Sequence, residues 1–401
     1  MTTIIKLPKY TIYPLIISVS LAVLNVSLIS PALPAMRNYY SISVYQSQLI
    51  VIIFIIGYAI CQLLFGTLAN IFGYRKCLIL GLTIGTIGSI ICVLSYYVNS
   101  YSILILGRFI DGLGISAGLV LSFAVIHDFY KDKKAKSCTT YCLMSLALVP
   151  AFANLIGGYL TFNFGFILCF YFLVIYNAAA CLFCIILPKI LNDKKVAFIS
   201  ISNILQNYAE VLKNKKVVTA AILYGLCLII IYGCIITLPF IGIDYLKLNA
   251  EVYGTLFLYS YLGYFVGCLI INFTSHKINE SSSIFLGILV TMIGGILLYI
   301  SILLGSTNTA ILFTALFIVF LGTPFIFVNT IIVGISSHKN KANASSIFNF
   351  IYALFAVVTL LFMDTIHVSL LLIVPAGIIL LMIISLIIYF LTIRKWTASR
   401  R

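Results

Sequence analysis

Charge is scarce in this chain: Asp, Glu, Lys and Arg make up only 8% of its 401 residues, whereas 63% are hydrophobic. The mean hydropathy is +1.20. Soluble globular domains carry roughly 25% charged residues, so the composition excludes one. The apolar runs are continuous and about twenty residues long, which excludes an outer-membrane barrel with its short alternating strands. The sequence therefore predicts an all-α integral membrane protein.

Motifs for phosphate and metal chemistry are also missing. No G-x-x-x-x-G-K-[ST] occurs, so the chain carries no Walker-type ATPase, and an energised process would draw on an ion gradient. The four histidines and eleven cysteines show no metal-ligand spacing, so we expect no metal and no cofactor. A membrane enzyme would have only His127 and Asp128 as an acid–base pair, and adjacent side chains on a helix point apart. We therefore do not expect an enzyme.

Twelve apolar segments, each long enough to cross a bilayer, occupy most of the sequence. The first follows Lys6 and Lys9, as a signal peptide would, but it is too long for one and eleven more follow, so we interpret it as a retained helix. The predicted helices are 10–33, 45–70, 76–98, 101–126, 137–160, 164–187, 217–240, 252–274, 282–304, 309–334, 343–363 and 367–393.

The positive charges lie almost entirely in alternate loops. Of the 24 Lys and Arg residues, 21 fall on one predicted side of the membrane, Arg37 and Lys247 fall on the other, and Arg108 lies within a helix. Positive residues collect in cytoplasmic loops, so both termini are expected in the cytoplasm. The net charge of +15 is spread over these loops without forming a patch, so we expect the lipid bilayer, and no nucleic acid, as a partner.

The longest of these loops divides the chain into a six-helix bundle at 1–187, a cytoplasmic linker at 188–216 and a second six-helix bundle at 217–401. Apolar residues at helical spacing in the linker predict an amphipathic helix on the membrane surface. These residues are Phe198, Ile201, Ile204, Leu205, Tyr208 and Leu212.

A faint internal repeat accompanies this division. Gly66 is followed ten residues later by Lys76 after the second predicted helix, and Gly267 is followed at the same offset by Lys277 after the eighth. Two halves with corresponding loop motifs are typical of secondary transporters built from repeats.

Arg108 and Asp111 are the only charged residues deep inside an apolar segment, the stretch 103–126. An ionisable group in the hydrocarbon core costs about 3 kcal/mol or more. A spacing of three residues places both on one helix face, where they can neutralise each other. Two interpretations stay open: a structural ion pair that fixes helix packing, or a pair that lies on a transport pathway.

The most specific motif is the stretch 57–76, GYAICQLLFGTLANIFGYRK. It resembles the signature loop between the second and third helices of the major facilitator superfamily, and in particular its Bcr/CflA drug-efflux branch, whose pattern is G-x-L-x-D-R-x-G-R-R/K. Asn70 and Ile71 replace the acid and the first arginine of that pattern, which weakens the family's charge latch. The gating positions that carry the resemblance are Gly66, Asn70, Gly73, Arg75 and Lys76.

The resemblance continues along the N-terminal half. The stretch 106–114 is similar to the fourth-helix motif R-x-x-Q-G-x-G, with Asp111 in place of Gln, and 149–158 is similar to the fifth-helix antiporter motif, with Asn154 in place of its second proline. Ser27 stands where the family's first helix usually carries an acid. The glycines favour close helix packing and the proline a kink. The positions concerned are Gly112, Gly114, Pro150, Gly157 and Gly158.

Several polar and aromatic residues are candidates for a substrate cavity. Asparagines within apolar helices must find partners inside a bundle, which makes them pathway candidates. Tyrosines at helix ends are more often interfacial anchors than cavity residues, and both readings stay open. The candidates are Asn25, Ser27, Tyr232, Tyr259, Tyr261, Asn329 and Asn349, with Tyr224 as a further tyrosine of this kind.

The resemblance implies the major facilitator fold and a monomeric secondary active transporter in the bacterial inner membrane. We expect proton-coupled efflux of drug-like small molecules by alternating access, with the cavity between the two halves. Because Ser27 replaces the usual acid, Asp111 is the one membrane carboxyl that can carry coupling. Two alternatives are a metabolite uptake or exchange carrier, which a Lys-, Ile- and Asn-rich composition typical of AT-rich bacterial genomes would suit, and a membrane sensor that has lost transport.

Overall fold

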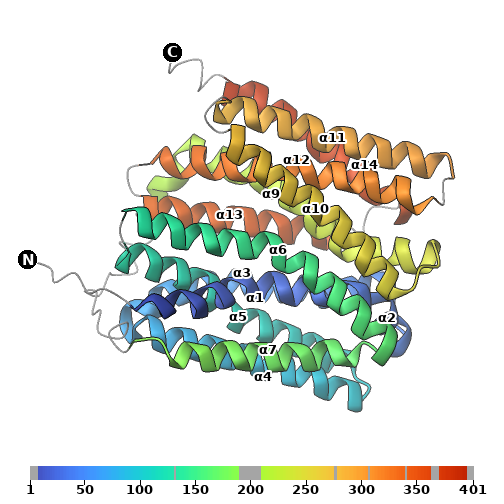
Figure 1. Cartoon of the computed structure of the whole chain (residues 1–401), viewed down its shortest axis with the longest axis horizontal. Helices are drawn as coiled ribbons and strands as arrows, with labels where there is room; N and C mark the ends of the chain where they lie inside the picture. The colour runs from blue at the N-terminus through green and yellow to red at the C-terminus, as the bar shows by residue number, and fades with distance from the viewer. Residues whose placement is uncertain are drawn as a thin grey trace, which may run out of the picture. The chain divides into compact units, whose positions relative to one another are not determined.

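The computed structural model describes residues 8–130, 132–188, 209–274, 278–305, 308–338, 341–362 and 370–394. Within these ranges the regular structure is helical throughout (Figure 1). The chain divides into two compact units, residues 1–199 and 200–401. The predicted amphipathic helix of the linker lies largely outside the described residues.

The first unit contains six long helices and three short helical segments among its described residues. They are η1 (Lys9–Thr11), α1 (Ile12–Ile29), η2 (Ser30–Ala32), α2 (Leu33–Tyr40), α3 (Val44–Phe72), α4 (Tyr74–Tyr97), α5 (Tyr101–Phe129), α6 (Asp132–Phe164) and α7 (Ile167–Ile185).

The second unit contains a further six long helices in its described part, two of which end in a π-helical segment. They are α9 (Lys215–Pro239) with η4 (Phe240–Tyr245), α10 (Ala250–Thr274), α11 (Glu280–Leu303), α12 (Thr309–Ser336), α13 (Lys341–Phe362), and α14 (Leu370–Ile388) with η6 (Tyr389–Ile393).

Each of the twelve predicted segments overlaps one of these long helices, which confirms the predicted all-α membrane fold. Eleven described segments, between 19 and 31 residues long, are apolar and long enough to span a bilayer. The remaining predicted segment, 343–363, coincides with α13, a helix of 22 residues.

The first predicted helix is wrong at its C-terminal end. The sequence placed the end at residue 33, whereas the helical path continues through η2 and α2 to Tyr40. Pro31 and Pro34 each stand in the first turn of a new helical segment. In that turn the missing N–H of proline breaks no hydrogen bond, so proline starts helices there instead of ending them.

Helix starts in both units are stabilised by side chains. At α3 the Ser43 hydroxyl accepts a hydrogen bond from the Gln46 amide at 3.1 Å, and the Gln46 side chain accepts one from the Ser43 amide at 2.8 Å. The side chain of Asn214 accepts hydrogen bonds from the first turn of α9 in the same way. These caps satisfy amide donors that a helix end leaves unpaired, so the local sequence sets where the helices begin.

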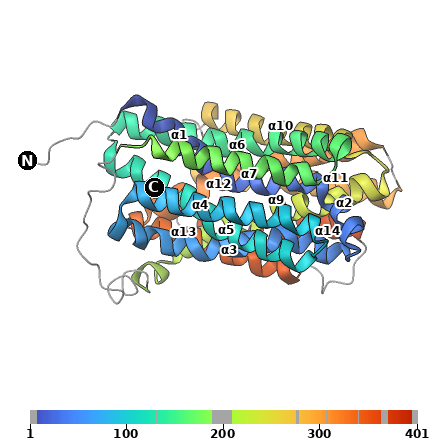
Figure 2. The same ribbon diagram turned by 90° about the horizontal axis from the view of Figure 1, so that it is seen from below.

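Glycines bring α4 and α5 into very close contact. A Cβ added at Gly114 of α5 would overlap the backbone of Gly85 in α4, and one added at Gly88 of α4 would overlap the backbone of Asp111. Small residues at matching positions let two helix backbones approach each other in a membrane. Asp111 therefore lies within this close contact between α4 and α5. Within this unit α1, α4, α5 and α7 run alongside one another in both views (Figure 1, Figure 2).

Candidate functional site

The two charged residues predicted within the membrane form an ion pair. On α5, Nη1 of Arg108 lies 2.9 Å from Oδ2 of Asp111, and both side chains are completely buried. The spacing of three residues produces the shared helix face that the sequence predicts. The pair points toward protein, which is where a membrane helix must place charged groups.

The guanidinium of Arg108 has neutral partners in addition to Asp111. Its Nε donates to the carbonyl of Ile50 on α3 at 3.1 Å. Its Nη1 lies 3.4 Å from Oδ1 of Asn25 on α1, and its Nη2 lies 3.5 Å from the Asn25 carbonyl. The Cζ atom also lies 4.4 Å from the ring centroid of Phe54, close enough for a cation–π contact. The cation is thus held by α1 and α3 independently of the carboxylate.

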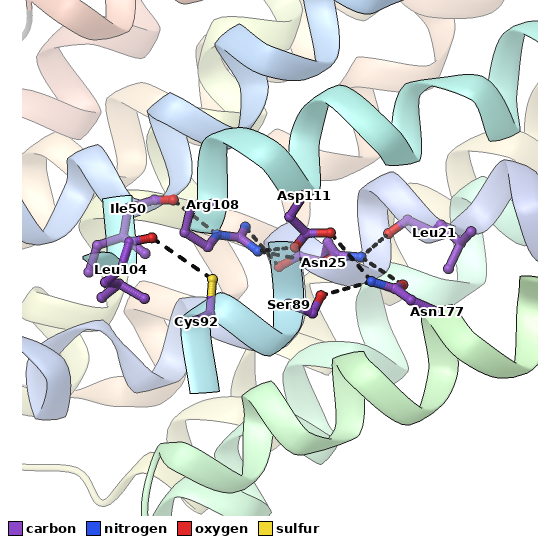
Figure 3. Close-up of polar contacts among 9 residues, drawn as sticks. All are labelled: Leu21, Asn25, Ile50, Ser89, Cys92, Leu104, Arg108, Asp111 and Asn177. Carbon is purple, nitrogen blue, oxygen red and sulfur yellow. Dashed lines mark hydrogen bonds and ion pairs between the residues drawn. The ribbon is translucent and has the colours of Figure 1, made fainter. Parts of the chain in front are cut away.

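The second carboxylate oxygen of Asp111 is held by Asn177 of α7. The Nδ2 atom of Asn177 lies 3.3 Å from Oδ1 of Asp111 and 2.9 Å from the hydroxyl of Ser89 on α4. Nδ2 of Asn25 in turn lies 3.5 Å from Oδ1 of Asn177 and donates to the Leu21 carbonyl at 3.0 Å. Figure 3 shows these contacts as one connected set.

We call Asn25, Ser89, Arg108, Asp111 and Asn177 the buried polar network. It joins α1, α4, α5 and α7, and Arg108 adds α3 through Ile50. All five side chains are fully buried. Buried polar groups in a low dielectric are costly unless each has a partner, so the network favours one arrangement of these helices and penalises partial rearrangement.

Asp111 is also the only acid in the middle of a described span. The other acids of the described spans, Asp244, Glu251 and Glu280, stand within two residues of a span's end. Among the described residues, Asp111 is therefore the one carboxyl near mid-membrane depth that can bind a proton.

Sequence reasoning missed Asn177 and Ser89. Asn177 carried the same signal that pointed to Asn25, an amide side chain inside an apolar helix, and could have been found by it. Ser89 carried no signal, because a serine in a membrane helix usually bonds to a carbonyl of its own helix. Its role depends on α7 lying against α4.

The sequence profile described as Major Facilitator Superfamily matches residues 15–360 of this chain. The chain belongs to the Major Facilitator Superfamily. It is therefore a multi-pass membrane transporter with a small-molecule substrate, and the resemblance seen in the stretch 57–76 is confirmed.

Three comparisons place this superfamily member among its relatives. It is 28% identical over 312 residues to a protein from Rickettsia bellii named Uncharacterized transporter, covering 76% of this chain and 74% of the relative. It is 29% identical over 166 residues, 41% of each chain, to the Bicyclomycin resistance protein homolog of Haemophilus influenzae. This chain also superposes on the solved structure of a bacterial homologue of the human lysosomal transporter Spinster, in its inward-facing and unoccupied conformation. The TM-score is 0.72 at 14% identity, over 95% of this chain and 96% of that one, so the two share a fold.

The superfamily's signature loop ties the ends of several helices together. Gly73, between α3 and α4, has a φ of 85°, which favours glycine. Nη2 of Arg75 donates to the Ile185 carbonyl at the end of α7 at 2.6 Å, and the Tyr74 hydroxyl donates to Asp128 near the end of α5 at 2.5 Å. A cation at a helix C-terminus stabilises unpaired carbonyls there. The loop thus links α3 and α4 to α5 and α7.

The other loop positions contribute less to these contacts. Gly66 is half-buried, and an added Cβ would lie 4.0 Å from Val120, an ordinary contact. Lys76 is exposed. The side chain of Asn70 lies outside the described residues, so the replaced latch acid remains a sequence observation.

The remaining glycine and proline positions act in helix packing. An added Cβ at Gly112 would overlap the Phe54 carbonyl of α3, and one at Gly157 would overlap the Leu28 carbonyl of α1. Gly158 is buried, and Pro150 lies buried within α6. Gly112 and Gly157 thus provide the same kind of close approach between helices as Gly114.

The predicted cavity residues have different surroundings within their own units. Asn25 belongs to the buried polar network, whereas Ser27, 1% exposed on the same helix, has no hydrogen-bond partner for its hydroxyl among the described residues. Asn329 donates to the Phe325 carbonyl of its own helix at 2.8 Å. Asn349 is half-buried on α13.

The three predicted tyrosines of the second unit differ in surroundings. Tyr261 is 5% exposed and packs edge-on against Phe257 and Phe320 in the interior of its unit. Tyr259 is 41% exposed and stacks on Phe317 with 5.2 Å between ring centroids. Tyr232 is half-buried on α9, on which Tyr224 also lies.

Proposed function

We propose that this transporter is a proton-coupled exporter of drug-like small molecules and that Asp111 is its coupling carboxyl. The observation that carries the proposal is the position of Asp111: fully buried, paired with Arg108, and bonded through its two oxygens to side chains of α5 and α7. A change of charge there alters contacts with several helices at once.

The partners of Arg108 make a protonated state of Asp111 tolerable. When Asp111 binds a proton, Arg108 loses its counter-ion but keeps the Ile50 carbonyl and the two oxygens of Asn25 as acceptors. A buried cation with no acceptor would be far more costly. The neutral carboxyl of Asp111 then holds α7 to α5 less strongly, because its hydrogen bond with Asn177 is no longer charge-assisted. Alternation between two accessible states would follow from this loosening.

The decisive experiment is substrate flux in proteoliposomes with and without an imposed pH gradient. We expect Asp111→Asn to abolish gradient-driven flux while exchange of labelled substrate without a gradient persists. Asp244→Asn, at a span end, is the matched control and is expected to keep gradient-driven flux. Full gradient-driven flux in Asp111→Asn would leave the pair with a structural role only.

The alternative is an uptake or exchange carrier of the same fold. It is favoured by two departures from the efflux pattern, Ser27 in place of the first-helix acid and Asn70 in place of the loop acid. Accumulation of solute inside oriented vesicles, in contrast to extrusion, would support it.

We further propose that the protein acts without enzymatic activity as a monomer in the bacterial inner membrane, as two six-helix bundles at 1–187 and 217–401 joined by a cytoplasmic linker at 188–216. Both termini then lie in the cytoplasm. A reporter active only in the cytoplasm should be active when fused after Lys76 or Arg401 and silent when fused near Asn99. An active fusion at Asn99 would reverse the orientation.

A further inference from the structure

A group of aromatic rings lies within the second unit. The ring of Tyr224 lies 4.4 Å from Phe327, 4.6 Å from Tyr352 and 5.4 Å from Phe348, measured between centroids. The ring of Tyr264 lies 6.4 Å from that of Phe327, and Tyr232 stands on α9, two turns beyond Tyr224. We call the four tyrosines Tyr224, Tyr232, Tyr264 and Tyr352 the tyrosine cluster.

Three of the four tyrosines in the cluster lie near mid-membrane depth. Tyr224 is nine residues beyond the start of α9, Tyr352 eleven beyond the start of α13, and Tyr264 ten before the end of α10. At about 1.5 Å per residue these distances are about 14 to 17 Å, half of a hydrocarbon core about 30 Å thick. Interfacial tyrosines, in contrast, stand at helix ends. An anchoring role therefore does not explain the position of these residues.

The hydroxyl groups of the tyrosine cluster have no hydrogen-bond partner among the described residues. None of the four donates or accepts a hydrogen bond with any residue in the described part of the chain, and all four side chains are partly exposed. In the first unit Tyr40 and Tyr74 bond to Ser95 and Asp128. Polar groups at membrane depth normally find a partner, because lipid supplies none. The cluster thus combines aromatic rings with hydrogen-bond donors that no described residue uses.

The acids of the second unit limit the class of compound that the tyrosine cluster can bind. The acids in the described part of the second unit are Glu210, Asp244, Glu251 and Glu280, and the last three stand at the ends of spans, with Glu210 outside them. The described part of the second unit thus offers a cation aromatic rings but no acid near mid-membrane depth as a counter-ion. A flat uncharged ring system with a carbonyl or ether oxygen would use both the faces and the hydroxyls.

We propose that the tyrosine cluster binds planar, uncharged aromatic compounds that carry a hydrogen-bond acceptor. This inference deepens the proposed function, because it names the class of compound that the transporter carries. It rests on that function only for the transport of the compound, since binding is measured separately from flux.

The test compares three probes of similar size: coumarin, which is flat and uncharged with a carbonyl; naphthalene, which lacks an acceptor; and N-methylquinolinium, which is a cation. Their affinities for the full-length protein in lipid nanodiscs are measured by ligand-observed NMR, with empty nanodiscs subtracted. We expect the wild-type protein to bind coumarin most tightly.

Substitutions then separate the ring from its hydroxyl. We expect Tyr224→Leu to weaken coumarin binding about tenfold through the lost stacking. Tyr224→Phe and Tyr352→Phe keep the ring and should weaken coumarin binding about threefold while leaving naphthalene binding unchanged. Tyr259→Phe and Tyr259→Leu are matched controls, because Tyr259 stacks on Phe317 outside the cluster, and should bind coumarin as the wild type does.

Four results would overturn the inference: no binding of coumarin by the wild type, tighter binding of N-methylquinolinium than of coumarin, unchanged coumarin binding in Tyr224→Leu, or an equal loss in the Tyr259 variants. Equal losses of coumarin and naphthalene in the Tyr→Phe variants would likewise count against hydrogen bonding. Coumarin binding that depends on Tyr224, combined with full gradient-driven flux in Asp111→Asn, would support this inference and refute the proposed coupling. The opposite pair of results would refute this inference and leave the coupling standing.

Discussion

The two units contain the same number of long helices in their described parts but hold them together differently. In the first unit, side chains bond across helices: Arg108 to Asn25 and Ile50, and Asn177 to Ser89 and Asp111. In the second, the polar groups Thr323, Asn329 and Thr330 of α12 bond to carbonyls three or four residues earlier in the same helix. A buried bond between helices there, Ser281 to Tyr389, joins two neutral hydroxyl groups.

This difference indicates how each unit responds to substitutions and to small movements of its helices. Polar bonds between helices specify one arrangement and are lost together when a helix moves. Helices that satisfy their own polar groups pack by dispersion and ring contacts, which tolerate small shifts. We therefore expect substitutions of buried polar residues to be more damaging in the first unit than in the second.

The largest expected effect comes from Arg108→Ala. It leaves the carboxylate of Asp111 buried without its cation, at a cost of about 3 to 5 kcal/mol. We expect a sharp loss of folded protein, measured by size-exclusion chromatography and thermal unfolding in detergent. The double variant Arg108→Ala with Asp111→Asn should recover much of the folded yield, because no unpaired charge remains. Equal losses in the single and double variants would mean that the packing of the arginine side chain, and not charge, holds the helices.

A smaller loss is expected from Gly114→Val, which tests the close contact between α4 and α5. The added side chain would overlap the backbone of Gly85, so the helices must separate, at a cost of about 3 kcal/mol. Gly233→Val in α9 is the control, because an added Cβ there meets nothing within 4 Å. Thermal unfolding of both variants is the measurement. A melting temperature as low in Gly233→Val as in Gly114→Val would remove the argument from packing.

The smallest of these effects compares one asparagine from each unit. Asn177→Leu removes bonds to Ser89 and Asp111 on two other helices, and we expect it to cost about 1 to 2 kcal/mol. Asn329→Leu removes a bond within its own helix and should cost less than about 0.5 kcal/mol. Thermal unfolding gives both values. In addition, Asn177→Leu should change the pH dependence of flux, which Asn329→Leu should leave unchanged. Equal costs in the two units would contradict the contrast between them.

Prediction from the sequence succeeded where the signal is local. Continuous apolar runs identify membrane helices one at a time, because each must satisfy its backbone internally and cover about the same thickness of hydrocarbon. The spacing of Arg108 and Asp111 identifies an ion pair for the same reason, since both lie on one helix and its geometry is known in advance. The first helix was predicted to end too early, because local sequence alone does not show whether Pro31 and Pro34 end one helical segment or start the next.

The sequence by itself thus determined the helices, the membrane setting and the buried charge pair. Only the tertiary structure decided which residues complete that pair. Asn177 contacts Asp111 and Ser89, which lie 66 and 88 positions away from it along the chain. The tertiary structure also decided which tyrosines come together, since Tyr224, Tyr264 and Tyr352 lie on three different helices. Such contacts depend on how helices pack and turn about their axes, and that depends on side chains from every neighbouring helix at once, which no single apolar segment encodes.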